Sequence, residues 1–268
     1  MKEKIGVLYI CTGKYFIFWK DFFDTCEKYF LPGYDKTYFV FTDAEEIFGE
    51  NLLHVKKIFQ PKLEFPRDTL LRYQMFNREK EQFQGMDYLY YFNANIRFVQ
   101  PIIEEEMFPG DGENGLTGYL HSGFYNKTPG EFIYERNPIS TAYIKEGDGK
   151  YYYQGCVIGG RRKEFLAMSA VLDEKVNTDL DKNFIAIWWD ESHLNHFLKD
   201  LQVKRLHPGY AYPEFANLPF EKKIIMVDKT KFGKVEYLRG QEISFTNRLK
   251  FIAKKAMIKL GWKRSSLK

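Results

Sequence analysis

Residues 87–95 read DYLYYFNAN, an apolar and aromatic run that ends in a polar, small, polar turn. A run of this kind is typical of a strand buried inside a sheet. Three similar runs precede it, at residues 4–11, 37–42 and 52–59, and the first is apolar throughout after Lys4. The first third of the chain therefore predicts four strands.

Helical patterns separate some of these strands. The first helix is expected at residues 16–30, because apolar residues recur there and the breaker LPG follows at residues 31–33. The second is expected at residues 66–84, with Asp68 as its cap. Strands and helices in this βαβαβαβ alternation predict an α/β fold with a twisted, mostly parallel sheet flanked by helices.

The length and composition fit one globular domain. The chain has 268 residues, of which 44% are hydrophobic, and we see no linker or repeat before its basic end. We therefore expect one domain over residues 1–240 and a tail over residues 241–268. The tail carries eight Lys or Arg and one acid, so of the total charge of +4 the rest of the chain holds −3. A basic tail on a mildly acidic body argues against a nucleic-acid-binding protein.

Cysteine usage and hydropathy bear on the cellular compartment. Cys11, Cys26 and Cys156 form an odd set without paired spacing, which supplies neither a disulfide framework nor a metal knuckle. A reducing, cytoplasmic location is the natural expectation. No run approaches the roughly 18 apolar residues of a membrane span. The apolar run after Lys4 is too short for a signal peptide.

Two turns at strand ends are expected to face a ligand, because sheets of this type bind ligands at the carboxyl ends of their strands. They are residues 10–13 (ICTG) and residues 93–95 (NAN). The second is a weak signal by itself, since Asn is common in ordinary turns. A plain turn after the strand stays open as the alternative.

Two adjacent acids, Asp190 and Glu191, follow Trp188 and Trp189. Acids at the start of a helix often serve only the helix dipole. Residues 185–189 are too apolar for the start of a surface helix, however, and a carboxylate held against aromatic rings suits stabilisation of an oxocarbenium-like centre. The residues alone leave both interpretations open.

Residues 151–160 read YYYQGCVIGG. Three tyrosines followed by small residues suggest backbone that lies close to a ligand. A tight connection from a strand to a helix explains Gly159 and Gly160 equally well.

Taken together, eight blocks in this order resemble glycosyltransferase family 6, which includes the histo-blood-group A/B transferases, the α1,3-galactosyltransferases and their bacterial relatives. The most specific is DESHLN at residues 190–195. The blocks are ICTGKY (10–15), DTLLR (68–72), NAN (93–95), HSGFY (121–125), FIYER (132–136), AYI (142–144), YYQGCVIGG (152–160) and WDESHLN (189–195). The resemblance implies a GT-A type domain and retaining α1,3-transfer of galactose or N-acetylgalactosamine from a UDP-sugar. The implied acceptor is a β-galactoside, plain or α1,2-fucosylated, on an oligosaccharide or lipid-linked glycan, which would give a blood-group-like product.

The resemblance also implies roles around the donor. Uracil and ribose are expected against the residues that end the first strand, and Arg72 against the donor sugar or diphosphate. Asp190 would hold sugar hydroxyls, and Glu191 would lie beneath the anomeric carbon as nucleophile or as stabiliser of an oxocarbenium. The expected donor-binding residues are Ile10, Cys11, Thr12, Tyr15, Arg72, Asn93, Ala94, Asn95, Gln154, Gly155, Cys156, Lys231 and Arg239.

Acceptor contacts are implied for His121, Phe124, Tyr153 and Glu191. Ser122 stands where the relatives usually have Pro, which puts the placement of that loop in doubt. Donor choice in the family follows a pair of positions that here are Gln154 and Cys156. Gly at the second position leaves room for an acetamido group, so the bulkier Cys156 favours UDP-galactose over UDP-N-acetylgalactosamine.

A metal is not expected. Asn93 and Asn95 stand where the vertebrate members carry two acids that share a divalent cation with the donor diphosphate. The bacterial branch resembles this sequence in having Asn-Ala-Asn, and an amide oxygen brings no negative charge. We therefore expect no cofactor besides the UDP-sugar substrate. Lys or Arg must then neutralise the phosphates, with Lys231 and Arg239 as the candidates.

The tail suggests a second surface. Residues 244–262 predict a helix with an apolar stripe flanked by lysines, which suits a helix lying on anionic lipid. This would make the protein peripheral on the inner membrane face, a hypothesis that co-sedimentation with anionic vesicles tests. A charged extension, or a helix packed on the domain, is the alternative.

Two other functional classes remain to be weighed. One is a sugar- or nucleotide-binding protein of the same fold that has lost turnover, against which the presence of Arg72, Asp190 and Glu191 weighs. The other is a nucleic-acid binder acting through the tail, which would bind DNA with strong salt dependence.

Overall fold

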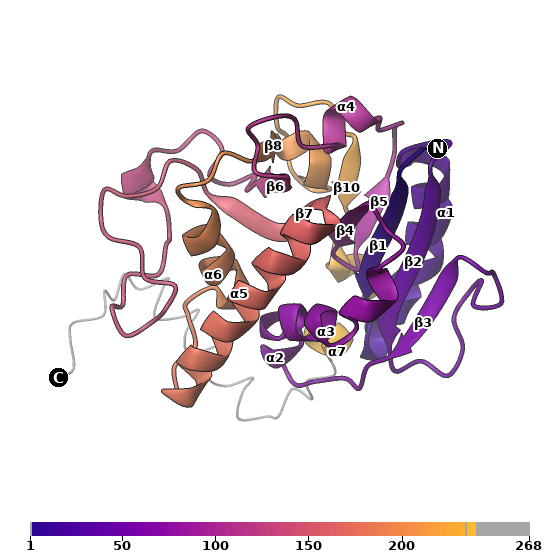
Figure 1. Cartoon of the computed structure of the whole chain (residues 1–268), viewed down its shortest axis with the longest axis horizontal. Helices are drawn as coiled ribbons and strands as arrows, with labels where there is room; N and C mark the ends of the chain where they lie inside the picture. The colour runs from indigo at the N-terminus through magenta and orange to yellow at the C-terminus, as the bar shows by residue number, and fades with distance from the viewer. Residues whose placement is uncertain (1, 234, 240–268) are drawn as a thin grey trace.

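The computed structural model describes residues 2–233 and 235–239 (Figure 1). Its main feature is a seven-stranded sheet of order β3-β2-β1-β4-β7-β6-β8. The strands are β1 (Lys4–Ile10), β2 (Asp35–Thr42), β3 (Val55–Phe59), β4 (Tyr88–Phe92), β6 (Leu116–Leu120), β7 (Tyr153–Arg161) and β8 (Lys204–Leu206). The first four run parallel, and only β7 is antiparallel to its neighbours β4 and β6. The predicted α/β fold with a mostly parallel sheet is confirmed.

A second, three-stranded sheet continues from the turn after β4. It has the order β5-β10-β9 and consists of β5 (Ile96–Phe98), β10 (Ile224–Met226) and β9 (Tyr212–Pro213). Because β10 pairs with β5 immediately after the Asn93–Asn95 turn, a segment from late in the chain reaches the carboxyl end of β4.

Helices cover both faces of the large sheet (Figure 1). One face packs against α1, and the other packs against α3, α5 and α6. Strand β1 supplies both cores, because Val7 and Tyr9 belong to the first and Leu8 to the second, and all three are fully buried. The helical segments are η1 (Gly13–Phe18), α1 (Trp19–Tyr29), α2 (Arg67–Leu70), α3 (Arg72–Arg78), η2 (Lys80–Phe83), α4 (Glu104–Met107), η3 (Pro129–Glu131), α5 (Arg162–Asp181), α6 (Trp189–Leu198), η4 (Pro208–Ala211), η5 (Lys229–Phe232) and α7 (Val235–Leu238).

Four details of the predicted element pattern are wrong. The connection between β2 and β3 holds turns and no helix, and β3 starts at Val55 because turns closed by hydrogen bonds occupy the residues before it. The helix expected at residues 66–84 is broken into α2, α3 and η2, with a first break at Leu71 (φ −95°, ψ 16°). Asp68 is not its cap, because it lies inside α2 and no side chain caps that helix.

Gly159 and Gly160 serve strand packing. A Cβ on Gly159 would lie 2.0 Å from the Tyr90 ring, and one on Gly160 (φ +143°) would lie 2.2 Å from the Gly115 carbonyl oxygen. The first contact is with β4 and the second is with the residue just before β6, so the close packing of β7 against its neighbours explains this pair.

The basic tail and the expected domain boundary at residue 240 lie outside the described residues, so both stay predictions. None of the described helices has the length and apolarity that a membrane crossing requires.

Candidate active site

A pocket opens at the carboxyl ends of β1 and β4, beside the first residues of β7. It brings together residues from six separate parts of the chain, as expected for this edge of an α/β sheet. The expected residues that line it are Ile10, Thr12, Tyr15, Arg72, Asn93, Ala94, Gln154, Gly155, Cys156, Asp190, Glu191 and Arg239.

Arg72 and Asp190 form a buried ion pair in this pocket. Arg72 Nε lies 3.1 Å from Asp190 Oδ2, and both side chains are almost completely buried. Arg72 Nη1 donates a hydrogen bond to the Gly155 carbonyl (2.5 Å), and the guanidinium also lies over the Tyr91 ring. Burial raises the pKa of Asp190 to about 6 although Arg72 opposes the shift. The pair joins α3, β7 and α6 at one point.

Glu191 lies next to this pair and faces the start of β7. The Gly155 N–H donates to Glu191 Oε2 (3.1 Å). Gly155 has no side chain to interfere, and a Cβ there would lie 3.2 Å from Asp190 Oδ2. Burial, reinforced by the charge of Asp190, raises the pKa of Glu191 to about 8. Two carboxyls with pKa values pushed apart in this way are typical of acids with different chemical tasks.

The backbone is strained where these acids begin helix α6. Trp189 has φ +52°, which is unusual for a bulky residue, and its ring packs edge-on against Phe65 with 4.5 Å between centroids. The turn before it is held at two points: the Trp188 N–H donates to Ser192 Oγ (3.0 Å), and the Ile187 N–H donates to Glu135 Oε2 (2.8 Å).

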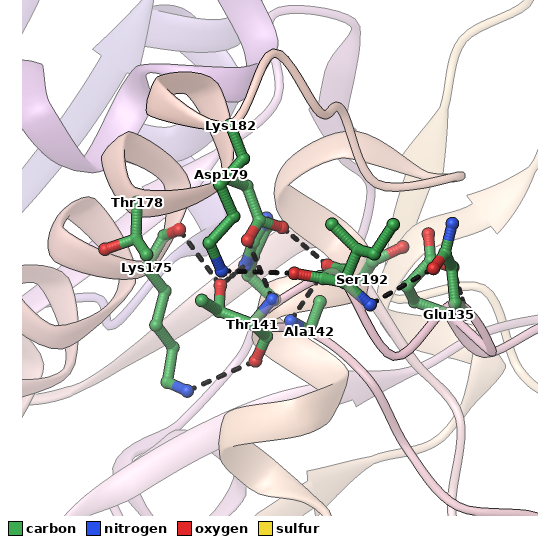
Figure 2. A network of polar contacts seen from close by, with 12 residues as sticks. Glu135, Thr141, Ala142, Lys175, Thr178, Asp179, Lys182 and Ser192 are labelled. Carbon is green, nitrogen blue, oxygen red and sulfur yellow. Dashed lines mark hydrogen bonds and ion pairs between the residues drawn. The ribbon is translucent and has the colours of Figure 1, made fainter.

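Behind α6, a polar network ties the loop after η3 to helix α5 (Figure 2). Asp179 accepts hydrogen bonds from Ser140 Oγ (2.5 Å) and from the Thr141 N–H (2.7 Å). Lys175 Nζ donates to the Thr141 carbonyl (3.2 Å). His193 Nε2 lies 3.7 Å from Asp179, and burial lowers the pKa of His193 to about 4, so this imidazole is neutral at neutral pH. The network reaches α6 through His193.

The two asparagines after β4 have different environments. Asn93 lines the pocket, and its Oδ1 accepts a hydrogen bond from the Tyr91 hydroxyl (2.9 Å). Asn95 is buried and donates through Nδ2 to the Val227 carbonyl (2.8 Å), while the Val227 N–H donates to the Asn95 carbonyl (2.8 Å). Asn95 thus anchors the segment that leads into η5.

The anchored segment brings a lysine into the pocket. Lys229, two residues after Val227, lines it together with Arg239. Burial, helped by the charge of Arg239, lowers the pKa of Lys229 to about 8. Lys231, the lysine expected from the sequence, is not a lining residue and instead pairs with Glu214 at 2.6 Å.

Donor atoms for a divalent metal are poorly represented at this site. Amide side chains, which carry no negative charge, occupy positions 93 and 95, and Asn93 Oδ1 already accepts a hydrogen bond from the Tyr91 hydroxyl. Within residues 2–233 and 235–239 no group of three His, Cys, Asp or Glu side chains is arranged as a metal site. The residues present therefore do not fit a site in which carboxylates hold a cation such as Mg²⁺. We derive no step through a metal.

Part of the expected acceptor set forms an aromatic cluster beside the pocket. The His121 ring contacts Phe124 and Tyr152 edge-on, at 5.0 and 5.7 Å between centroids. The Tyr152 hydroxyl is buried and has no hydrogen-bond partner among the described residues. Burial raises the pKa of Tyr152 above its usual range, and the charge of Glu191 adds to the shift. The side chains of Tyr152 and Glu191 therefore lie close together.

Four other expected residues do not line the pocket. Cys11 and Tyr153 are buried in the two cores, on either side of the sheet, and Asn95 and Lys231 act as described above. Their expected direct contacts with a substrate stay predictions.

The pocket also contains residues that were not assigned as site residues from the sequence. They are Phe65, Asp68, Thr69, Tyr91, Trp188, Trp189 and Lys229. Asp68, Thr69 and Trp189 lie inside the family-like blocks at residues 68–72 and 189–195, so the sequence did point to them. Trp188 directly precedes the second block. Asp68 stands out because its Oδ1 atom is buried and has no hydrogen-bond partner within residues 2–233 and 235–239.

Comparison with known proteins gives a consistent result. The family model described as glycosyltransferase family 6 matches residues 1–239. The O-antigen biosynthesis glycosyltransferase WbnI of Escherichia coli is 34% identical over 227 residues, which cover 85% of this chain and 95% of that protein. Globoside alpha-1,3-N-acetylgalactosaminyltransferase 1 of Homo sapiens is 28% identical, over 82% of this chain and 64% of its own length. Histo-blood group ABO system transferase 1 of Rattus norvegicus is 30% identical, over 78% of this chain and 61% of its own length. The chain therefore spans a little under two thirds of these vertebrate relatives.

Proposed function

The chain belongs to glycosyltransferase family 6, and on that premise we propose that it is a retaining, metal-independent α1,3-glycosyltransferase. The proposed donor is UDP-galactose, with UDP-N-acetylgalactosamine as the second candidate, and the proposed acceptor is a β-galactoside, plain or α1,2-fucosylated. The observation that carries the proposal is the joining of Arg72, Asp190 and Glu191 around Gly155 in one pocket. A protein that only binds sugars has no need of a buried carboxylate with a raised pKa at such a point.

The proposed reaction breaks the bond between the anomeric carbon and the diphosphate oxygen and forms a bond from that carbon to the acceptor oxygen. The acceptor hydroxyl gives its proton to the departing diphosphate oxygen, and UDP leaves with the electron pair of the broken bond. Retention follows either from a glycosyl intermediate on Glu191 or from attack on the face that UDP leaves, and an ionised Glu191 stabilises positive charge on the sugar in both cases. Asp190, held by Arg72, is proposed to accept hydrogen bonds from donor-sugar hydroxyls.

Charge on the leaving diphosphate requires compensation. We assign this role to Lys229, the first residue of η5, and to Arg239, the residue after α7, because both line the pocket. The attraction between their positive charges and the diphosphate becomes stronger when a substrate excludes water from the pocket.

The proposed roles predict a bell-shaped pH dependence. Glu191 must be ionised and Lys229 must be protonated, and burial brings the pKa of each to about 8. Activity should therefore rise with pH as Glu191 ionises and fall as Lys229 loses its proton. A profile of kcat/KM for the donor should show a narrow maximum near the shared pKa of about 8. Lys229→Arg should remove the alkaline limb, since a guanidinium stays charged there. An unchanged alkaline limb would mean that another group causes it.

Donor choice should depend on Cys156. Its side chain is buried, lines the pocket and belongs to the same core as Val7 and Tyr9. Cys156→Gly should open space for an acetamido group, so the ratio of kcat/KM for UDP-N-acetylgalactosamine to that for UDP-galactose should rise by about tenfold. Cys156→Ser, of nearly equal size, is the matched control. If the two variants gave equal ratios, the size of this side chain would not set donor choice.

The direct test of function is a transfer assay with both UDP-sugars and 2′-fucosyllactose. NMR of the product should show a new α1,3 linkage. The alternative, a sugar- or nucleotide-binding protein without turnover, predicts UDP binding by calorimetry and no product with this acceptor or with unfucosylated lactose.

A further inference from the structure

Asn195 lies one turn after Glu191 on α6 and is only 1% exposed. Its side chain makes three hydrogen bonds, donating with both Nδ2 hydrogens and accepting once with Oδ1. Oδ1 accepts from the Tyr153 N–H (2.8 Å), and Nδ2 donates to the Tyr153 carbonyl (2.8 Å) and to the Glu191 carbonyl (2.9 Å). One carboxamide therefore clamps both backbone groups of the first residue of β7 and also the backbone of Glu191.

Strand β7 is irregular at the place where this clamp acts. Its ladder with β6 passes from the pair Gly118–Ile158 directly to the pair Tyr119–Gln154, so residues 155–157 face no residue of β6. This is a bulge, and bulges are frequent beside active sites because they re-aim backbone and side chains. Here the bulge turns Gly155 toward the pocket.

The freed backbone groups of the bulge are satisfied by pocket side chains. The Gly155 carbonyl accepts from Arg72 Nη1 (2.5 Å), and the Gly155 N–H donates to Glu191 Oε2 (3.1 Å). The position of Glu191 thus depends on the register between α6 and β7. Among described contacts, the clamp by Asn195 is the one that links the backbones at residues 153 and 191 through a single side chain.

We propose that Asn195 is a positioning residue that sets the register of α6 against the β7 bulge and thereby holds Glu191 at its working place. The inference rests on the function proposed above for Glu191. Asparagine suits the task because its amide both donates and accepts. Aspartate would keep the acceptor but would present a carboxylate to two carbonyl oxygens, and alanine would leave three buried backbone groups without this partner.

Hydrogen–deuterium exchange tests the clamp without reference to activity. In Asn195→Ala, exchange at the amides of Tyr153 and Gly155 should accelerate by about tenfold or more, because both report on opening of the bulge. The matched control is Asn77→Ala. Asn77 also joins two elements through its amide, donating to Ser169 and Asp173 of α5, but it lies outside the pocket. The control should leave exchange at residues 153 and 155 unchanged.

Kinetics test the positioning role. In Asn195→Ala and Asn195→Asp, kcat per UDP-binding site should fall about tenfold or more, with KM for the donor within about threefold of the unmodified value. Counting sites by UDP titration removes the effect of any unfolded fraction. Unchanged exchange, or a kcat per site within about twofold, would overturn the proposal. Absence of transfer by the unmodified protein would instead overturn the proposed function, and the exchange result would still decide whether the clamp exists.

Discussion

Glu191→Gln should lower kcat for sugar transfer by about a thousandfold or more while UDP affinity stays within about twofold. Glutamine keeps the shape of the side chain. Its amide oxygen can still accept the hydrogen bond from the Gly155 N–H, which is 3.1 Å long in the unmodified protein. It removes the negative charge, which is the property that stabilises a developing oxocarbenium. A thousandfold loss corresponds to about 4 kcal/mol of transition-state stabilisation. Steady-state kinetics and UDP calorimetry on the same preparation measure both quantities.

The matched control is Glu174→Gln, which makes the same chemical change on the exposed side of α5. It should transfer sugar at the unmodified rate. If Glu191→Gln retained more than about a tenth of the activity, Glu191 would not be the acid that acts on the anomeric carbon.

Lys229→Ala should lower kcat/KM for the donor by about a hundredfold and also weaken UDP binding. The reason is electrostatic. The amides of Asn93 and Asn95 bring no negative charge that could hold a cation, so the proposed reaction relies on side-chain cations to neutralise the diphosphate, and Lys229 lies in the pocket wall.

Lys231→Ala provides the comparison. Lys231 lies only two residues away but pairs with Glu214 (2.6 Å) at the surface, so its removal should change kcat/KM by less than about threefold. A large loss in Lys231→Ala with none in Lys229→Ala would favour the lysine expected from the sequence over the one that the pocket contains.

The contrast between these lysines shows where sequence interpretation reaches its limit. The strand ends at residues 10–13 and 93–95 could be placed in advance, because parallel strands bring their carboxyl ends to one edge of a sheet. Which of two lysines faces that edge depends on the Asn95–Val227 hydrogen bonds and on the turn that Asp228 begins by accepting from the Thr230 N–H. Neither contact produces a periodic pattern of residues that could be recognised in the sequence.

Three further features of the site could not be predicted from the sequence, for a related reason. The helix expected at residues 66–84 breaks at Leu71, which no Gly or Pro marks, and the break helps to place Phe65 and Asp68 in the pocket wall. Trp189 adopts a backbone conformation that its residue type disfavours. The β7 bulge arises from contacts with Arg72, Glu191 and Asn195, which are distant in sequence. Tertiary contacts set all three features, and local propensity does not report them.

We propose that this pocket transfers a sugar from a UDP-donor with side-chain cations in place of a metal. The most direct measurement is transfer from UDP-galactose to 2′-fucosyllactose by protein stripped with EDTA, assayed with EDTA present and again after addition of excess Mn²⁺. We expect product in EDTA at a rate within about twofold of the rate with Mn²⁺. Product that forms only with Mn²⁺ would contradict the account, because the amides of Asn93 and Asn95 would then hold a metal after all.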